Sequence, residues 1–386
     1  MAGSRHVARG AMTEQLDLEI IHPEALRPED RAAWEAIRAD DPTLDHPYLD
    51  PRFALAAAEV PGAALAVFRR RGGAVAFFPF QRRGRLIQPL GAPLSDYHGV
   101  VAAPADRLTP AAVARRLGGT LRVGGWIVSD VGEPGFLRRA RMTTDTAAGP
   151  QAVTDWLDSR NHRFAKNLRR MARGLERDHG AATFVWDDRD PAVLEWIIER
   201  KRAQYRRTRR HDVFACGWTA DLLRRLYAAR PGGYGLRVAS LRSAAGELVA
   251  AEASLDDGRT LHLWFPAYDP AYAAYGPGAL LTRRELEQAA ADGYRLVDFG
   301  VGDAGYKSAM AEAGASAYEG QAGRTGPVAL AARAFARGPA PLRAFQQSLG
   351  RRFDIINACE TRAVDWWAGA AAAAAAAARK TLGAPA

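Results

Sequence analysis

The stretch at residues 261–292 constrains the fold more than any other part of the chain. It reads as a strand that enters a Gly276-Pro-Gly278 turn and continues as a helix. Gly293, a residue type that commonly ends helices, closes this helix, and the apolar run at 296–300 follows it. A strand, a helix and a strand over this length predict a βαβ unit whose two strands are parallel.

The turn before the helix also predicts an anion-binding site. The first turn of a helix has backbone N–H groups without partners and carries the positive end of the helix dipole, so it can hold a phosphate. Gly276 and Gly278 leave room for an approaching anion, and Pro277 suits a helix start. An ordinary strand-to-helix connection is the alternative, because a single Gly-Pro-Gly is a weak motif.

Three apolar segments at residues 236–241, 249–255 and 260–265 predict an antiparallel meander upstream of the turn. Residues 256–258 form the second loop, and glycine at its third position suits the left-handed conformation that such loops need. This loop sets Ala253 opposite Leu261, so that one face of the hairpin is wholly apolar.

The same register places Glu252 directly opposite His262 on the other face. Directly opposed side chains touch. A Glu–His contact partway along a sheet is costly without a task or good partners, so we expect this pair to be functional. A partly solvated structural pair is the alternative.

Val301-Gly-Asp-Ala-Gly-Tyr-Lys307 follows the last strand of the βαβ unit. This glycine-rich segment carries a carboxyl group, a phenol and an amine, on Asp303, Tyr306 and Lys307. Reactive groups on a loop at the carboxyl end of a strand favour a functional site over scaffold.

Several short motifs, in this order, resemble one protein family. They are similar to segments of the GNAT-superfamily acyltransferases of the CelD/BcsL type, which are related to Fem-type aminoacyl transferases. The motifs are Tyr268-Asp-Pro270, Tyr275-Gly-Pro-Gly278, Asp298-Phe-Gly300, Gly302-Asp303, Gly305-Tyr-Lys307 and, in the N-terminal half, Ser95-Asp-Tyr-His-Gly99. Gly276 stands where relatives often have serine, a difference that should not harm phosphate binding.

The resemblance implies an α/β protein with a mixed sheet, made of two GNAT-like folds in tandem and a helical C-terminal tail. We therefore expect a disordered tail at 1–15, an N-terminal GNAT-like domain at 16–148, an acyl-CoA-binding domain at 151–326 and a helical, Ala-rich tail at 327–386. The implied co-substrate is acetyl-CoA or another acyl-CoA. The implied reaction is N- or O-acyl transfer to a polysaccharide, sugar or cell-envelope precursor, linked to cellulose or other exopolysaccharide synthesis.

This reaction assigns roles to the candidate residues. A base takes a proton from the attacking amine or hydroxyl, and an acid can protonate the departing thiolate. Glu252 with His262 are the candidates for the base, and Tyr306 resembles the phenol that many GNAT enzymes use as the acid. Asp303 and Lys307 are candidates for acceptor binding. The cofactor-binding candidates are Tyr275, Gly276, Pro277, Gly278, Ala279 and Leu280, where backbone N–H groups of Gly276, Gly278, Ala279 and Leu280 would hold the pyrophosphate.

The net charge of +10 favours anionic partners, such as CoA phosphates, nucleic acid, acidic glycans or lipid head groups. Residues 164–176 predict an amphipathic helix with a basic wet face made of Arg163, Lys166, Arg169, Arg170 and Arg173. The densest positive patch lies at 206–211, where Arg207, Arg209 and Arg210 are candidates for binding an anionic substrate. A solvated face is the alternative for both.

Two cysteines, Cys216 and Cys359, predict a reducing compartment without a disulfide framework, and the N-terminus lacks the apolar core of a signal peptide. We therefore expect a cytoplasmic protein. No Cys/His cluster has metal-ligand spacing, so no metal is expected. The paired Trp366 and Trp367 before the Ala-rich run suit contact with a membrane surface, and packing on the protein is the alternative.

Three classes of function remain open. The first is an acyl-CoA-dependent transferase that acts on a small-molecule or glycan acceptor. The second is a Fem-type transferase that uses an aminoacyl-tRNA, which the basic patches would suit. The third is a non-catalytic GNAT-like scaffold for an exopolysaccharide complex. DNA is not expected as a partner in any of them.

Overall fold

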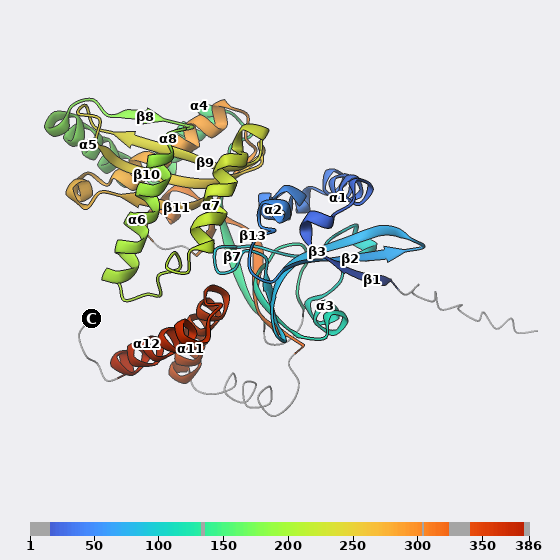
Figure 1. Cartoon of the computed structure of the whole chain (residues 1–386). Coiled ribbons are helices and arrows are strands. Elements are labelled where there is room, and N and C mark those ends of the chain that lie inside the picture. Colours follow the sequence, from blue (N-terminus) through green and yellow to red (C-terminus); the bar gives the residue numbers. More distant parts are fainter. Residues whose placement is uncertain (1–15, 133–135, 303–304, 324–339, 382–386) are drawn as a thin grey trace, which may run out of the picture.

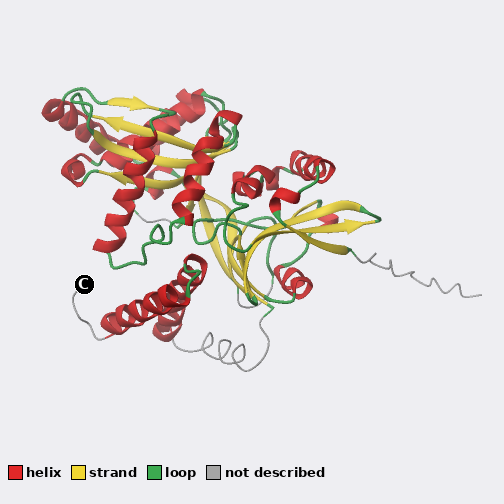
Figure 2. Ribbon diagram, in the orientation of Figure 1, coloured by secondary structure: helices red, strands yellow, loops and turns green. Residues whose placement is uncertain are grey.

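The computed structural model describes residues 16–132, 136–302, 305–323 and 340–381. The described strands join into one sheet of thirteen strands that runs through both halves of the chain (Figures 1 and 2). Their order is β1-β2-β3-β4-β6-β13-β7-β12-β11-β10-β9-β8, and β5 pairs with β3. Parallel and antiparallel pairs occur together, which confirms the predicted mixed α/β class. The predicted tail at 1–15 lies outside the described residues, and so do residues 327–339 and 382–386 of the predicted helical tail.

The N-terminal half contributes one part of the sheet and three helices. β2 and β3 form an antiparallel hairpin, and Trp34 of α1 stacks on Phe77 of β3 with ring centroids 4.8 Å apart. The strands are β1 (Asp17–Ile21), β2 (Ala63–Arg70), β3 (Gly73–Arg83), β4 (Leu86–Pro89), β5 (Val101–Ala102), β6 (Thr120–Trp126) and β7 (Leu137–Asp145). The helices are α1 (Pro28–Asp40), α2 (Pro51–Ala56) and α3 (Pro110–Leu117), with short 3-10 turns at Pro23–Ala25, Pro42–Leu44, Pro47–Leu49 and Pro104–Asp106.

The C-terminal half contributes the other strands. They are β8 (Thr183–Val185), β9 (Gly235–Arg242), β10 (Leu248–Asp256), β11 (Thr260–Tyr268), β12 (Leu296–Val301) and β13 (Glu312–Ala322). The helices are α4 (Pro150–Arg160), α5 (His162–His179), α6 (Pro191–Arg207), α7 (Trp218–Ala229), α8 (Pro277–Ala291) and α9 (Lys307–Met310), with 3-10 turns at Arg230–Gly232 and Pro270–Tyr275. The predicted meander is therefore β9, β10 and β11.

Helices cover both faces of this part of the sheet (Figure 1). Ala253 and Leu255 of β10 pack in one buried cluster with Leu223 of α7, so α6 and α7 lie on that face. Leu261 of β11 packs with Leu286 of α8 in a second cluster, so α8 and its neighbours α4 and α5 lie on the opposite face. Alternating side chains of a strand point to opposite faces, so the polar residues of β10 and β11 are also distributed between these two faces of the sheet.

The two halves are joined by exchanged strands. β13, from the end of the C-terminal half, lies between β6 and β7 of the N-terminal half, and β7 in turn pairs with β12. The expected boundary at 148–151 falls in the connection from β7 to α4. The sheet is continuous at this point, so the division into two domains stays a prediction.

The predicted βαβ unit is confirmed. β11 and β12 are parallel, with Thr260 opposite Leu296 and His262 opposite Asp298, and α8 connects them. The pairing stops at His262, although β11 continues to Tyr268 and β12 to Val301. The two strands therefore part at the carboxyl end of the unit.

The predicted register of the β10–β11 hairpin is wrong. Asp256 pairs with Leu261, and beyond a bulge at Trp264 the partner of Glu252 is Pro266 instead of His262. Asp256 belongs to the strand and not to the loop, because its buried carboxylate accepts hydrogen bonds from the side chains of Arg237 and Tyr294 at 2.8 and 2.7 Å. By strand alternation, Glu252 and His262 lie on opposite faces of the sheet, so they do not form the expected pair.

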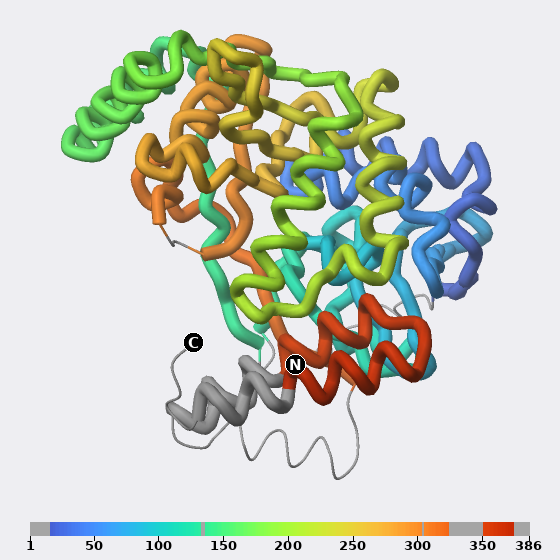
Figure 3. The backbone as a smooth tube through the Cα atoms, turned by 60° about the vertical axis from the view of Figure 1, so that its left-hand side comes forward, coloured from blue at the N-terminus to red at the C-terminus, as the bar shows by residue number. Residues whose placement is uncertain are grey.

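The C-terminal tail is helical, as predicted, and consists of α11 (Ala340–Cys359) and α12 (Ala363–Thr381). It lies beside both halves of the chain (Figure 3). Gln88 donates to the carbonyl oxygen of Asp354 at 3.1 Å, and Trp218 donates to the carbonyl oxygen of Cys359 at 3.0 Å. In the described part of the chain, no helix combines the length and the apolar character that crossing a membrane requires.

Candidate functional site

A cavity of about 240 Å³ opens where β11 and β12 part. It is lined by residues from both halves of the chain: Asp96, Glu252, Leu263, Trp264, Pro266, Phe299, Gly300, Val301, Tyr306 and Lys307. Since β11 has lost its partner strand here, its backbone groups on this side are open to a ligand. An extended ligand can pair with such an exposed strand edge.

Glu252 is the buried acid of this cavity. Its side chain is 1% exposed, and its Oε1 atom accepts no hydrogen bond from the described residues. Burial raises the pKa of Glu252 to about 7, against the opposing influence of the ammonium groups of Lys201 and Lys307. A carboxyl group that titrates near neutral pH and has a free oxygen suits a general base.

A second buried carboxyl group lies within electrostatic reach of Glu252. Glu285 of α8 is 1% exposed, and burial together with the Glu252 carboxylate raises its pKa well above the usual range. Two nearby carboxyl groups do not both ionise readily. Glu285 therefore stays protonated at neutral pH, and Glu252 is the member of the pair that loses its proton.

The phenol of Tyr306 and the amine of Lys307 also line the cavity. Burial raises the pKa of Tyr306 well above that of a free tyrosine, so the phenol keeps its proton at neutral pH. The Nζ atom of Lys307 donates to the carbonyl oxygen of Phe299 at 2.6 Å. The structure thus brings Tyr306 and Lys307 together with Glu252 in one cavity, whereas Asp303 lies outside the described residues.

His262 belongs to a separate network on the other face of the sheet. Its Nε2 atom lies 3.0 Å from Oδ2 of Asp96, and its Nδ1 atom lies 3.5 Å from Oδ1 of Asp298, an ion-pair distance. Burial alone would lower the pKa of His262, but Asp298 and Asp96 outweigh it and raise the pKa to about 9. His262 is therefore a cation at neutral pH and cannot act as a base in that state.

Asp298 is the buried anion at the centre of this network. Arg141 donates to its Oδ2 atom from Nη2 at 2.6 Å, while its Oδ1 atom accepts from the backbone of Gly300 at 2.6 Å and from Tyr97 at 3.1 Å. Although burial acts in the opposite direction, Arg141 and His262 hold the pKa of Asp298 well below its usual range. Asp298 is thus ionised and fully hydrogen-bonded.

The same network contains the one group of described residues with metal-ligand geometry. Donor atoms of His46, His262 and Asp298 lie within 4.8 Å of one another. Arg141 already supplies the cation that Asp298 needs, and a protonated His262 has no lone pair to offer a metal. These residues therefore fit a charge-balanced network better than a metal centre. Burial lowers the pKa of His46 to about 3, so this imidazole is neutral.

Asp96 connects the network to the cavity. Its carboxylate is held by His262 and is 44% exposed, whereas His262 and Asp298 are fully buried. Asp96 belongs to the Ser95–Gly99 segment of the N-terminal half and lines the cavity beside Glu252. It therefore presents a fixed negative charge to a molecule bound in the cavity.

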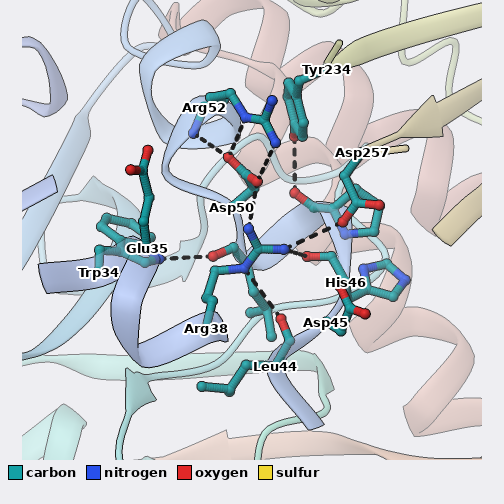
Figure 4. A network of polar contacts seen from close by, with 12 residues as sticks. Trp34, Glu35, Arg38, Leu44, Asp45, His46, Asp50, Arg52, Tyr234 and Asp257 are labelled. Atoms are coloured by element: carbon teal, nitrogen blue, oxygen red, sulfur yellow. Dashed lines mark hydrogen bonds and ion pairs between the residues drawn. The ribbon is translucent and has the colours of Figure 1, made fainter. Parts of the chain in front are cut away.

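Contacts between the halves hold the segment that carries His46 against this site (Figure 4). Arg38 binds Asp50 at 2.5 Å and, across the halves, Asp257 at 3.3 Å. Tyr234 donates from its hydroxyl group to the carbonyl oxygen of Pro47 at 2.9 Å. The site is thus built from both halves of the chain and depends on their relative position.

The Gly-Pro-Gly turn starts α8 as predicted, but most of its backbone donors are already used. Gly276 donates to Ala273 at 3.2 Å, and both Ala279 and Leu280 donate to the carbonyl oxygen of Gly276, at 3.0 and 3.2 Å. Of the four predicted donors, only Gly278 has an N–H group without a partner among the described residues. A Cβ atom added at Gly278 would meet no atom within 4 Å, so this position has room for a side chain.

The predicted basic patch does not line the cavity. Arg207 ends α6, Arg209 and Arg210 follow it, and all three side chains are exposed. None of them forms an ion pair with the described residues. Their assignment to an anionic substrate stays a prediction.

Sequence reasoning missed Asp96, Arg141, His46, Glu285 and Lys201. Asp96 lies within the Ser95–Gly99 segment, so the resemblance of that segment was a usable signal. Glu285 is a charged residue at a buried position of an amphipathic helix, which is unusual enough to be noticed. Arg141, His46 and Lys201 carry no sequence signal, since they come from separate segments of the chain that only the tertiary structure brings together.

Part of the chain is similar to a known protein family. Residues 162–308 match the family model described as an acetyltransferase (GNAT) domain. No curated protein matches the chain significantly. The matched segment, which includes α5, β8 to β12 and the helices between them, is thus similar to acetyltransferase domains of the GNAT type.

Similar solved structures have low sequence identity. A tandem GNAT protein from the clavulanic acid biosynthesis pathway matches 81% of this chain and 100% of its own, at 12% identity and a TM-score of 0.48. FemX matches 78% of this chain and 96% of its own, at 12% identity and a TM-score of 0.49. L-PGS from Bacillus licheniformis matches 79% of this chain and 95% of its own, at 12% identity and a TM-score of 0.47.

Proposed function

We propose that the protein transfers an acyl group, in the simplest case acetyl, from acyl-CoA to an amine or hydroxyl acceptor in the cavity between β11 and β12. The proposal rests on Glu252, a buried carboxyl group that lines this cavity, has a pKa of about 7 and has one oxygen atom without a hydrogen-bond partner among the described residues. The cavity lies where β11 and β12 part, and these two strands flank α8, whose N-terminus is the expected phosphate site. The proposed base and the expected phosphate site therefore belong to the same part of the fold. The match of residues 162–308 to GNAT acetyltransferases supports the same reaction.

The proposed chemistry uses residues of the cavity in sequence. The acceptor nitrogen or oxygen attacks the thioester carbonyl carbon, and Glu252 takes the proton that the acceptor loses. The N–H groups of β11 that have no partner on β12 are suited to hold the carbonyl oxygen as it becomes negative. When the carbon–sulfur bond breaks, the Tyr306 phenol can give its proton to the thiolate and later regain one from solvent.

Asp96 gives the network of His262, Asp298 and Arg141 a role in this proposal. It places a fixed carboxylate beside the base, where it can accept a hydrogen bond from an acceptor hydroxyl or amine. Lys307 adds a donor on the same cavity wall. A polar wall of this kind suits a sugar, a polysaccharide or a cell-envelope precursor, and the resemblance to CelD/BcsL proteins favours a link to cellulose or other exopolysaccharide synthesis. We infer a cytoplasmic location from the need for acyl-CoA.

A transferase that uses an aminoacyl-tRNA is the second candidate, because exposed cations gather on α5 and at the end of α6. Calorimetry with acetyl-CoA, beside a gel-shift assay with tRNA, separates the candidates. We expect binding of acetyl-CoA and release of free CoA thiol once an acceptor is present. A mass-spectrometric screen of amines, sugars and oligosaccharides with acetyl-CoA then identifies the acceptor. If the protein binds tRNA but does not bind acetyl-CoA, the second candidate is favoured. If it binds neither, a non-catalytic scaffold is the function that remains.

A further inference from the structure

The exposed face of α5 carries a groove that the proposed chemistry does not use. The groove has a volume of about 610 Å³, and its cations are Arg163, Lys166, Arg170 and Arg173, which we call the α5 basic face. All four side chains are exposed, and none forms an ion pair with the residues that the structure describes. Other cations of this helix are compensated: Arg169 binds Asp158 at 2.9 Å.

The spacing of these cations makes the α5 basic face a site for an anion. The four residues follow one another at intervals of three and four along the helix, so like charges are neighbours and repel one another. A ligand with several negative charges would relieve this repulsion. Phosphate groups suit such a cluster, because arginine binds them through paired hydrogen bonds.

Helix α5, which carries the α5 basic face, packs against the turn where the proposed pyrophosphate site lies. Tyr275, beside the turn, donates from its hydroxyl group to Asp178 of α5 at 2.9 Å. A Cβ atom added to Gly276 would lie 2.4 Å from Cε of Met171, which shows that α5 packs directly on the turn. Arg170 lies one helical turn before Gly174, where an added Cβ atom would lie 3.5 Å from the ring of Tyr275. A phosphate chain that leaves the N-terminus of α8 therefore has α5 as its neighbour.

We propose that the α5 basic face binds the 3′-phosphate at the adenosine end of CoA. This inference rests on the proposed function, and it adds a phosphate subsite outside the βαβ unit. Of the predicted backbone donors of the turn, Gly278 alone has no partner in the described chain. The turn by itself therefore offers few hydrogen-bond donors to the phosphates of CoA. The α5 basic face supplies the positive charge that the turn lacks.

The test compares CoA with dephospho-CoA, which lacks only the 3′-phosphate, by titration calorimetry. The variant is Lys166→Glu/Arg170→Glu, two exposed positions in mid-helix where glutamate keeps helix propensity. The control is Arg207→Glu/Arg210→Glu, which makes the same change of net charge away from α5. Circular dichroism and thermal melting show whether each variant is folded.

We expect wild type to bind CoA roughly tenfold more tightly than dephospho-CoA, as one charge-assisted phosphate contact allows. The α5 variant should lose this preference, and the control variant should keep it. Equal binding of the two ligands by wild type overturns the inference, and so does a preference that survives in the α5 variant. In both cases the proposed function stands, because CoA is still bound.

Two further outcomes are informative. If wild type binds neither CoA nor dephospho-CoA, the proposed function and this inference both fail. Total tRNA is the third probe. If the α5 variant loses binding of tRNA and retains the preference for CoA, the α5 basic face is a polynucleotide surface, which overturns the inference. Titrations at two salt concentrations check that the preference is electrostatic, since screening should weaken it.

Discussion

At the scale of single residues, the protonation state of Glu252 controls the proposed reaction. Glu252→Gln keeps the shape of the side chain but removes the base, so we expect turnover to fall about a hundredfold or more. Affinity for CoA should stay near that of wild type. In wild type, kcat/KM should rise with pH through an apparent pKa near 7, because the base must lose its proton to act. Single-turnover rates across pH 5.5–8.5, once an acceptor is known, measure both effects.

Glu285→Gln is the matched control for this experiment. Glu285 is also buried and within electrostatic reach of Glu252, but it is already protonated at neutral pH, so an amide resembles its working state. Turnover and the apparent pKa of the rate profile should both change little, because a neutral amide replaces a carboxyl group that is already neutral where Glu252 titrates. Near-normal turnover of Glu252→Gln would contradict the assignment of the base.

The raised pKa of His262 predicts that the stability of the protein, instead of its turnover, depends on pH. Its pKa is raised from 6.5 to about 9, so the folded state holds this proton more tightly than the unfolded state does. The stabilisation is fully present below pH 6.5 and is lost as pH rises through 9. A shift of this size corresponds to about 3 kcal/mol. The free energy of unfolding from urea titrations at pH 6 and pH 9.5 should therefore fall less in His262→Gln than in wild type. An equal fall in both proteins would show that His262 is not the cation of the network.

At the scale of elements, the N-terminus of α8 is the test of the cofactor site. Gly278→Asp places a negative charge and added bulk where the phosphates are expected, and it should abolish CoA binding. The fold should survive, because the space at this position is open. Ala192→Asp is the matched control, since Ala192 occupies the same position after the proline that starts α6. The affinity of both folded variants for CoA is measured by calorimetry. Unchanged affinity in Gly278→Asp would contradict the placement of the cofactor site at the N-terminus of α8.

At the scale of the whole molecule, α11 links the two halves of the chain. Beyond the contacts of Gln88 and Trp218, Glu360 after the helix lies 3.0 Å from Nε2 of His211. Cys359 is fully buried against the C-terminal half. A chain that ends at residue 326 should therefore melt several degrees lower than the full chain, and Cys216 should react faster with a thiol reagent. An unchanged melting temperature would show that the tail contributes no stability.

The βαβ unit, the meander and the turn before α8 could be read from the sequence, because they depend on local pattern. Apolar runs, a Gly-Pro-Gly turn and a terminal glycine act over a few residues, and the structure retains all of them. Glu252, Tyr306 and Lys307 could be found as candidates for the same reason, since each stands at the end or in the middle of a recognisable element. They meet in one cavity because β10 pairs with β11 and because the segment after β12 lines the space where β11 and β12 part.

Pairing between strands and between halves was decided only by the tertiary structure. A bulge at Trp264 and the buried ion pair of Asp256 with Arg237 shifted the hairpin register, and period-two alternation contains no information about either. The network of Asp96, His262, Asp298 and Arg141 is assembled from four strands or loops of both halves. Such contacts depend on burial and charge balance between distant segments, whereas local sequence records only which residues are available for them.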